Sequence, residues 1–267
     1  RAFPIRVEYP PARRGENELA HLGRTVQQAL GETDGDVLAF LPGRREIAHA
    51  QRMLDALLPS LRGREAGGEG LALAKHPAQP EPSSGASRHL LPEGEGKIEV
   101  LPLHGELSLA EQRAALAPAD AGTRRVILAT NVAESSITVP GVRAVIDVGL
   151  AREPRFDPNS GFTRLATVNI SQASADQRAG RAGRVAPGIA FRLWPESRRL
   201  EPSRTPEIAQ AELSGLALEL AAWGVGSDAA SALPWLDAPP AGALAAARDL
   251  LQRLGAIDAE LHITSLG

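Results

Sequence analysis

The segment SADQRAGRAGR, residues 174–184, combines arginines and glycines in a pattern that could bind phosphate. Ser174 is a good helix N-cap, and Gln177 three residues later completes a capping-box pattern. With about 100° of rotation per helical residue, Gln177, Arg181 and Arg184 then share one face. Arginine offers a planar, always charged fork of donors for phosphate oxygens. We therefore expect this face to receive a polyphosphate.

The two glycines of this segment need a reason. Gly180 and Gly183 each cost about 1 kcal/mol relative to alanine inside a helix, which is understandable if another backbone or a ligand must approach closely. Arg178 points away from the shared face, and we expect its substitution to be mild. The alternative interpretation is a solvated basic face on an ordinary surface helix, although such a helix gains nothing from two glycines.

Alternating extended and amphipathic segments must position these residues. Strand character is found in 3–9, 35–43, 97–103, 124–130, 142–149 and 189–194. Helical spacing is found in 16–30, 44–58, 108–117 and from Ser174 onward. This alternation predicts an α/β fold with an open, mostly parallel sheet flanked by helices.

Three segments depart from that alternation. Residues 152–156 and 163–170 flank the turn DPNSG, which predicts an inserted β-hairpin. Residues 62–96 are rich in Gly, Pro, Glu and Ser, and we expect a disordered insertion. After Trp194 the chain has helical segments and a short extended end, which favours a small winged-helix domain. The predicted domains are 1–196 and 197–267.

Composition limits the classes of function. The net charge is −3, so a broad basic face for nucleic acid is not expected and any phosphate binding must be local. The chain contains no cysteine, which excludes disulfides and fits a reducing, cytoplasmic location. No apolar run reaches the length of a membrane span. The six histidines have no metal-like spacing, so no metal site is assigned.

Four segments in order carry a family resemblance. QRAGRAGR (177–184) matches the pattern Q-x-x-G-R-x-G-R, motif VI of superfamily 2 helicases, and ATNVAESSIT (129–138) closely resembles motif V of the DEAH-box branch. FLPGRREI (40–47) and LPLHGELS (101–108) resemble motifs IV and IVa, and WLDAPP resembles the winged-helix region that follows in that branch. The chain is most similar to the bacterial HrpB-type helicases of this DEAH-box family.

The resemblance implies a second RecA-like domain followed by a winged helix. The sequence has neither a G-x-x-x-x-G-K-[ST] phosphate loop nor an Asp-Glu-Ala-His box, which the family carries on its first RecA-like domain. ATP with Mg²⁺ would therefore be held mainly by that first domain, as a partner in a longer chain, and this part alone would be inactive. Residues 115–125 offer no aromatic ring on which the base could stack, so we expect ATP or another nucleoside triphosphate to be used.

The resemblance also assigns roles around the nucleotide. Arg181 and Arg184 would be arginine fingers, and Gln177 would orient the attacking water. Asp147 would contact the ribose, with a strand-end turn carboxylate as the alternative. Ser136 would sense the nucleotide state.

Further roles concern RNA or another single-stranded nucleic acid. Thr130, Asn131 and Thr138 would hold its backbone, since small hydroxyl and amide groups bind phosphate and ribose without reading bases. Gly43 and Gly105 would let backbone amides approach the strand. Ordinary turn chemistry is the alternative for each of these residues. For the whole chain, the alternative is a non-catalytic adaptor with a helicase-like shape, which the retained glutamine and arginines of motif VI disfavour.

Overall fold

The computed structural model describes residues 3–58, 97–135, 137–157, 160–225 and 233–267, which form two compact units. The first unit comprises Arg1–Ala151 and Asn169–Pro202, and the second comprises Arg152–Val168 and Ser203–Gly267. The sequence placed the boundary at 196–197, but the following residues still pack on the first unit, where the carbonyl of Glu201 accepts a hydrogen bond from the amide of Gln172 at 2.8 Å. The predicted insertion at 62–96 lies outside the described residues.

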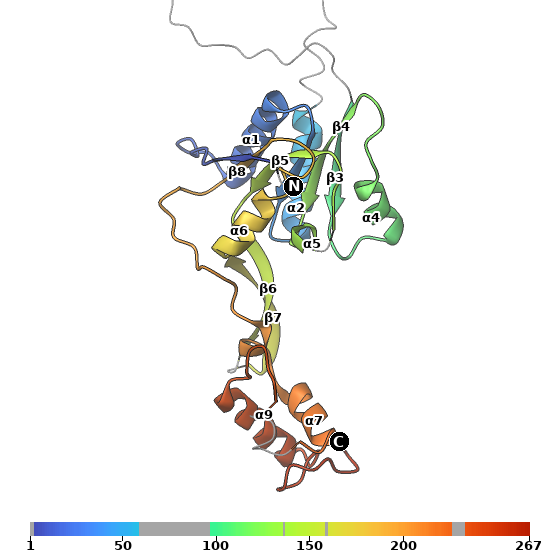
Figure 1. The fold of residues 1–267 in the computed structure, drawn as a ribbon, viewed down its shortest axis with the longest axis vertical. Helices are drawn as coiled ribbons and strands as arrows, with labels where there is room; N and C mark the ends of the chain where they lie inside the picture. Colours follow the sequence, from blue (N-terminus) through green and yellow to red (C-terminus); the bar gives the residue numbers. More distant parts are fainter. Residues whose placement is uncertain (1–2, 59–96, 136, 158–159, 226–232) are drawn as a thin grey trace, which may run out of the picture. The chain divides into compact units, whose positions relative to one another are not determined.

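A six-stranded sheet organises the first unit (Figure 1). Its strands are β1 (Ile5–Glu8), β2 (Asp36–Phe40), β3 (Lys97–Leu103), β4 (Thr123–Ala129), β5 (Val142–Asp147) and β8 (Gly188–Arg192). The spatial order is β1-β8-β5-β2-β4-β3, and every adjacent pair is parallel. The predicted mostly parallel sheet is thus confirmed.

Helices cover both faces of this sheet. On one face, α1 (Glu18–Glu32) and α2 (Arg44–Leu57) pack against alternate residues such as Val37 and Ala39 of β2. On the other, α4 (Leu109–Leu116), α5 (Val132–Ser135) and α6 (Gln172–Ala179) pack against Leu38 and Phe40. Strand β2 is buried along its whole length, as expected for a central parallel strand.

The second unit contains a hairpin and helices. Strands β6 (Leu150–Asp157) and β7 (Phe162–Asn169) form the predicted hairpin, and its helical elements are η1 (Glu207–Ala209), α7 (Ser214–Ala222) and α9 (Ala241–Arg253). Of the helical segments expected after Trp194, the first α-helix begins only at Ser214. The carbonyl of Gln210 instead accepts from the amide of Phe156 at 3.3 Å, which ties this segment to β6.

The core of the second unit lies between α7 and α9, where Leu220 and Leu251 are buried. Beyond α9, Ile257 and Ile263 form an isolated antiparallel bridge. These elements leave the winged-helix assignment a prediction. None of the helices in the described ranges combines the length and the apolar character that a membrane span requires.

Candidate functional site

The residues that were predicted to contact the RNA gather where three neighbouring β-strands end. Gly43 follows β2, Gly105 follows β3, and Thr130 and Asn131 follow β4. The amide of Thr130 donates to the carbonyl of Leu103 at 3.2 Å, so the ends of β4 and β3 are joined directly. The carboxyl edge of a parallel sheet is where α/β proteins bind ligands. The structure thus brings these four residues to the expected edge.

The two glycines differ in their surroundings. Gly43 is buried and is the N-cap of α2, with extended backbone and no side-chain cap. Gly105 is exposed, and a Cβ atom placed on it would meet nothing within 4 Å. Packing therefore does not demand glycine at position 105. Beside them, Arg44, the first residue of α2, forms an ion pair with Glu106.

The segment from Thr130 to Thr138 contains the short helix α5. The amide of Glu134 donates to the carbonyl of Asn131 at 2.9 Å, which forms its single turn. Asn131 and Thr138 are exposed and Thr130 is half-buried, so all three are within reach of a ligand. Ser136, the predicted nucleotide sensor, lies outside the described residues.

The prediction that α6 begins after Ser174 was wrong. The N-cap is Ser171, whose hydroxyl oxygen accepts from the amide of Ser174 at 3.1 Å, so Gln177 completes no capping box. The amides of Gln172 and Ala173 donate to carbonyls of the segment at 201–202. These long-range bonds satisfy the first turn of the helix, and the local pattern contains no information about them.

The prediction that Gln177, Arg181 and Arg184 share one helical face was also wrong, because α6 ends at Ala179. Arg181 and Arg184 follow in turns, so helical spacing does not relate them to Gln177. They nevertheless reach the same segment: Arg181 donates from Nη1 to the carbonyl of Ile137 at 2.6 Å, and Arg184 donates from Nη1 to the hydroxyl of Thr138 at 2.6 Å. Tertiary contacts, not helix geometry, bring the two arginines together.

Gly183 serves a close backbone approach. A Cβ atom there would lie 2.7 Å from the carbonyl oxygen of Phe3, whose amide donates to the carbonyl of Gly183 at 2.9 Å. Of the two reasons expected for this glycine, another backbone or a ligand, the structure shows the backbone. Gly180 is the C-cap of α6, and a Cβ atom would lie 3.1 Å from the carbonyl oxygen of Gln177.

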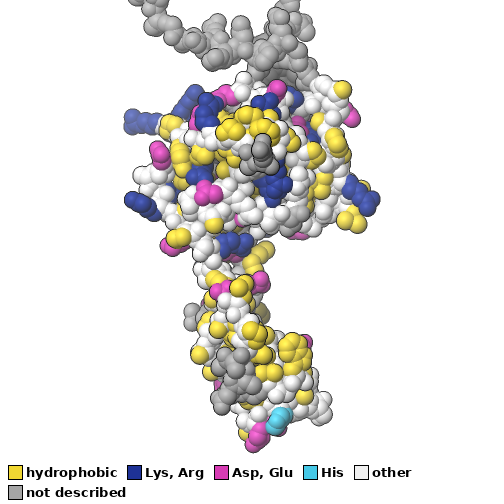
Figure 2. Space-filling model, viewed as in Figure 1, with side chains coloured by type: hydrophobic (Ala, Val, Ile, Leu, Met, Phe, Trp, Pro, Cys, Tyr) yellow, Lys and Arg dark blue, Asp and Glu magenta, His cyan; other side chains and the backbone are white. Residues whose placement is uncertain are grey.

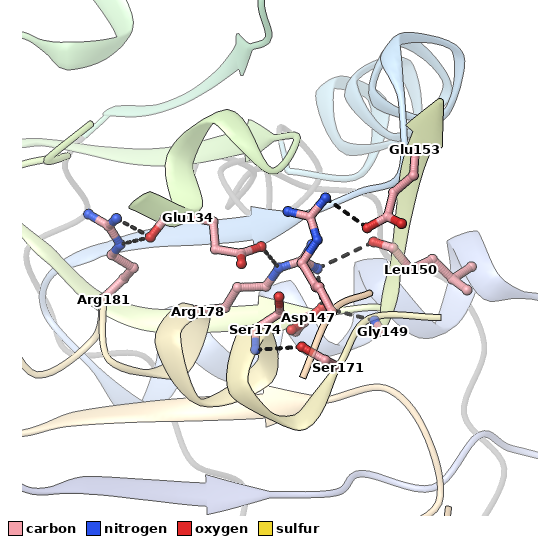
Figure 3. A network of polar contacts seen from close by, with 10 residues as sticks. Glu134, Asp147, Gly149, Leu150, Glu153, Ser171, Ser174, Arg178 and Arg181 are labelled. Carbon is pink, nitrogen blue, oxygen red and sulfur yellow. Dashed lines mark hydrogen bonds and ion pairs between the residues drawn. The ribbon is translucent and has the colours of Figure 1, made fainter. Parts of the chain in front are cut away.

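Arg178 has a different place from the one expected. It is only 1% exposed, and its guanidinium lies 4.8 Å from the centroid of the Phe40 ring. Figure 3 shows it between two carboxylates: Nε donates to Glu134 Oε2 at 3.0 Å and Nη1 donates to Asp147 Oδ1 at 2.9 Å. The expected mild effect, which concerned hydrolysis, stays a prediction. For stability the change is not mild, because removing this side chain leaves two buried carboxylates without their partner.

The sequence does contain a signal for Arg178. Glu134 follows the apolar residues Val132 and Ala133, and Asp147 ends a strand that is buried along most of its length. A carboxylate in such surroundings needs a cation or several donors. The sequence therefore indicates that a cation is needed, but not which of the arginines supplies it.

Asp147 itself is buried. Oδ1 accepts from the amide of Gly149 at 2.9 Å as well as from Arg178, whereas Oδ2 has no hydrogen-bond partner. Burial raises the pKa of Asp147, and the charge of Arg178 opposes that shift. For Asp147 to contact a ribose, the residues that bury its carboxylate would have to move. The contact with ribose stays a prediction.

Charge at the edge is local and positive. Burial lowers the pKa of Arg181, which is 5% exposed, and the neighbouring charge of Arg184 lowers it further. Arg184 and Gln177 are exposed. Elsewhere, basic and acidic side chains are interspersed on the face shown in Figure 2. Within the described part of the chain, no cluster of three or more His, Asp or Glu residues is arranged to hold a metal ion.

Comparison with known proteins gives consistent matches. The family described as "Helicase conserved C-terminal domain" matches residues 82–186. The chain is 38% identical over 262 residues to the ATP-dependent RNA helicase HrpB of Escherichia coli, covering 97% of this chain and 28% of that protein. It is 35% identical over 259 residues to the pre-mRNA-splicing factor ATP-dependent RNA helicase DEAH10 of Arabidopsis thaliana, covering 96% of this chain and 32% of that protein.

Solved structures agree. The crystal structure of the Escherichia coli DEAH/RHA helicase HrpB superposes with a TM-score of 0.78 at 36% identity, covering 99% of this chain and 29% of that one. The parallel sheet with helices on both faces is therefore the RecA-like fold that was predicted. The chain spans less than a third of the relatives named here.

Proposed function

Because the chain is the C-terminal helicase region of a DEAH-box member of superfamily 2, we propose that it supplies half of a nucleoside-triphosphate site together with a track for RNA. Arg181, Arg184 and Gln177 face a triphosphate that a first RecA-like domain of the same longer protein holds. Thr130, Asn131 and Thr138, with the backbone at Gly43 and Gly105, hold the RNA strand.

The single observation that carries this proposal is the proximity of Arg181 and Arg184. Burial lowers the pKa of Arg181, and the nearby charge of Arg184 lowers it further. The carboxylate of Glu134 is taken up by Arg178, and both arginines donate to uncharged oxygens of 134–138. Within the described residues neither of these neighbouring cations has a carboxylate bound to it, so the pair is suited to an anion such as a phosphate.

The residues present fit ATP with Mg²⁺ in part. Bound ATP supplies the phosphoryl group that is transferred to water. In a loose phosphoryl-transfer transition state, charge spreads over the oxygens of that group, and two guanidinium forks stabilise it. The exposed amide of Gln177 orients the attacking water. Since no metal-binding cluster occurs among the residues described, Mg²⁺ belongs to groups outside them.

RNA is the proposed polymer because the two relatives are RNA helicases by name. Small polar groups at strand ends contact phosphate and sugar rather than base edges, so binding is independent of sequence. The low overall charge fits a short track rather than a broad basic face.

The test is nucleotide hydrolysis by the full-length protein with and without single-stranded RNA. Arg184→Ala should lower the hydrolysis rate by about a hundredfold or more, since arginine fingers contribute about 10³–10⁵. The matched control is Arg52→Ala, another exposed arginine, on α2, which should hydrolyse normally. Normal hydrolysis by Arg184→Ala would show that Arg184 is not an arginine finger, whereas no hydrolysis by the wild-type full-length protein would favour a non-catalytic adaptor.

The isolated chain provides a second test of the proposal. We expect no hydrolysis from it, because the phosphate loop and the Asp-Glu-Ala-His box are absent from its sequence. Turnover that co-purifies with the chain and is abolished by Arg184→Ala would contradict the assignment of triphosphate binding to another domain.

A further inference from the structure

Glu134 is held by two arginines through two different groups. Its carboxylate accepts from Arg178 Nε at 3.0 Å, and its carbonyl oxygen accepts from Arg181 Nε at 3.0 Å (Figure 3). Its amide in turn donates to the carbonyl of Asn131. One residue therefore joins the proposed RNA-contacting segment 130–138 to the turn that carries the proposed finger arginines.

Arg178 fixes the other end of this connection to the sheet. Nη1 donates to Asp147 Oδ1, at the end of β5, and to the carbonyl of Leu150 at 3.3 Å. The guanidinium also lies over the ring of Phe40, at the end of β2. Two central strands thus hold Arg178 in one orientation, away from water, where charge-assisted hydrogen bonds are strong and directional.

The helix α5 cannot hold its own position. It has four residues, a single turn, and so gains little from intrahelical bonds. Its place at the edge of the sheet depends on tertiary contacts, among which the side chain of Glu134 is buried and charged. If α5 shifts when RNA binds, the geometry at Arg178, at Arg181 or at both must therefore change.

Resting on the proposed function, we propose that Arg178 and Glu134 are positioning residues that couple RNA binding to nucleotide hydrolysis. They touch neither ligand. Their ion pair sets the place of segment 130–138 relative to Arg181, so that RNA held by this segment brings the finger arginine into its working position. Glutamine at 134 keeps the volume but loses the charge, and lysine at 178 cannot bridge Glu134 and Asp147 as a planar fork does.

A second buried ion pair in the same unit provides a matched control. Arg125 donates from Nε to Asp36 Oδ2 at 2.9 Å, and its amide donates to Asp36 Oδ1 at 2.8 Å. Both side chains are as buried as those of Arg178 and Glu134. Asp36 begins β2, so this pair lies at the opposite edge of the sheet from Asp147. Substitutions there test what loss of a buried ion pair does by destabilisation alone.

The experiment compares Glu134→Gln and Arg178→Lys with Asp36→Asn and Arg125→Lys in the full-length protein. Melting temperature, hydrolysis without RNA, and hydrolysis with a saturating oligouridine RNA are measured. We expect all four variants to melt lower. Only Glu134→Gln and Arg178→Lys should lose the RNA stimulation, by about fivefold or more, the lower end of usual coupling between sites.

The outcomes separate the two proposals. If both ion pairs alter the stimulation ratio equally, or if Glu134→Gln keeps the wild-type ratio, Arg178 and Glu134 are structural only and the inference is wrong. Should Arg178→Lys not fold, the near-isosteric Glu134→Gln decides. If the wild-type protein shows no hydrolysis that RNA stimulates, the proposed function itself fails, and this is seen before any variant is compared.

Discussion

Arg184 donates a hydrogen bond to the hydroxyl of Thr138 at 2.6 Å, so a proposed phosphate-binding cation is the partner of a proposed RNA-contacting group. The Thr138 oxygen accepts this bond and keeps its own proton to donate to a phosphate oxygen. A nucleotide that draws Arg184 away changes the charge beside Thr138. By linkage, RNA must then change nucleotide affinity by the same factor.

Thr138→Val should therefore weaken RNA binding and reduce the effect of nucleotide on it. Loss of one hydrogen bond costs about 0.5–1.5 kcal/mol, which corresponds to a dissociation constant about 2- to 13-fold higher. Fluorescence anisotropy with a labelled RNA, with and without a non-hydrolysable nucleotide, measures both quantities. Thr130→Val is the control, because among the described contacts its hydroxyl does not meet Arg184; it should weaken RNA binding and leave the nucleotide effect in place.

Replacing the two proposed finger arginines should separate the hydrolysis rate from stability. Arg184 is exposed, so Arg184→Lys should leave the melting temperature near that of wild type and still fail to restore hydrolysis, because a point charge does not reproduce the fork. Arg181 is buried and holds two carbonyl groups, so Arg181→Lys should lower both the rate and the melting temperature. Wild-type rates in either lysine variant would show that charge alone is sufficient.

Arg178→Ala should be among the most destabilising single changes in the first unit. It leaves Glu134 and Asp147 buried without a cation, which costs about 3–5 kcal/mol in the free energy of unfolding. Denaturant unfolding of the chain measures this cost. Arg184→Ala, on the surface, should stay within about 0.5 kcal/mol of wild type. Equal stabilities of the two variants would contradict the buried position of Arg178.

Asp147→Asn should be milder than Asp147→Ala, because the amide oxygen still accepts from Gly149 and Arg178. The sign of its pH dependence follows from the raised pKa. Stability from the neutral carboxyl is present below the usual value of 3.8 and is lost as pH rises through the higher pKa of the folded protein. The melting temperature of Asp147→Asn relative to wild type should therefore increase as the pH rises above 3.8. A difference that does not change with pH would contradict the direction of the shift.

Local patterns were sufficient for the sheet and for the edge where the site lies. The apolar run around β2 and the alternation of strands with helices predicted the fold, because hydrophobicity and its periodicity are visible in short stretches of sequence. The residues after β2, β3 and β4 then met at one edge, since parallel strands all end there. The predicted helical face shared by Gln177, Arg181 and Arg184 was wrong. Distant carbonyls cap the start of α6, and the helix ends before Arg181 and Arg184.

The role of Arg178 was missed for a related reason. Helical spacing says which way a side chain points and not what it meets, and its two carboxylate partners come from positions 44 and 31 residues away in the sequence. Only the folded chain brings α5, β5 and α6 around one guanidinium. The sequence did contain the need for a cation, in two carboxylates set among buried residues, but not the choice among several arginines.

The second unit is assembled from two separate stretches of the chain, with β6 and β7 encoded inside the first unit. Cutting the polypeptide at a single point therefore cannot release it whole. A protein that starts at Ser203 lacks the hairpin, and with it the backbone bond that Phe156 makes to Gln210. During synthesis from the ribosome, the hairpin emerges before the helices it groups with. Gene fusions and domain exchanges in this region need to carry residues 152–168 and 203–267 together, spliced in as a pair.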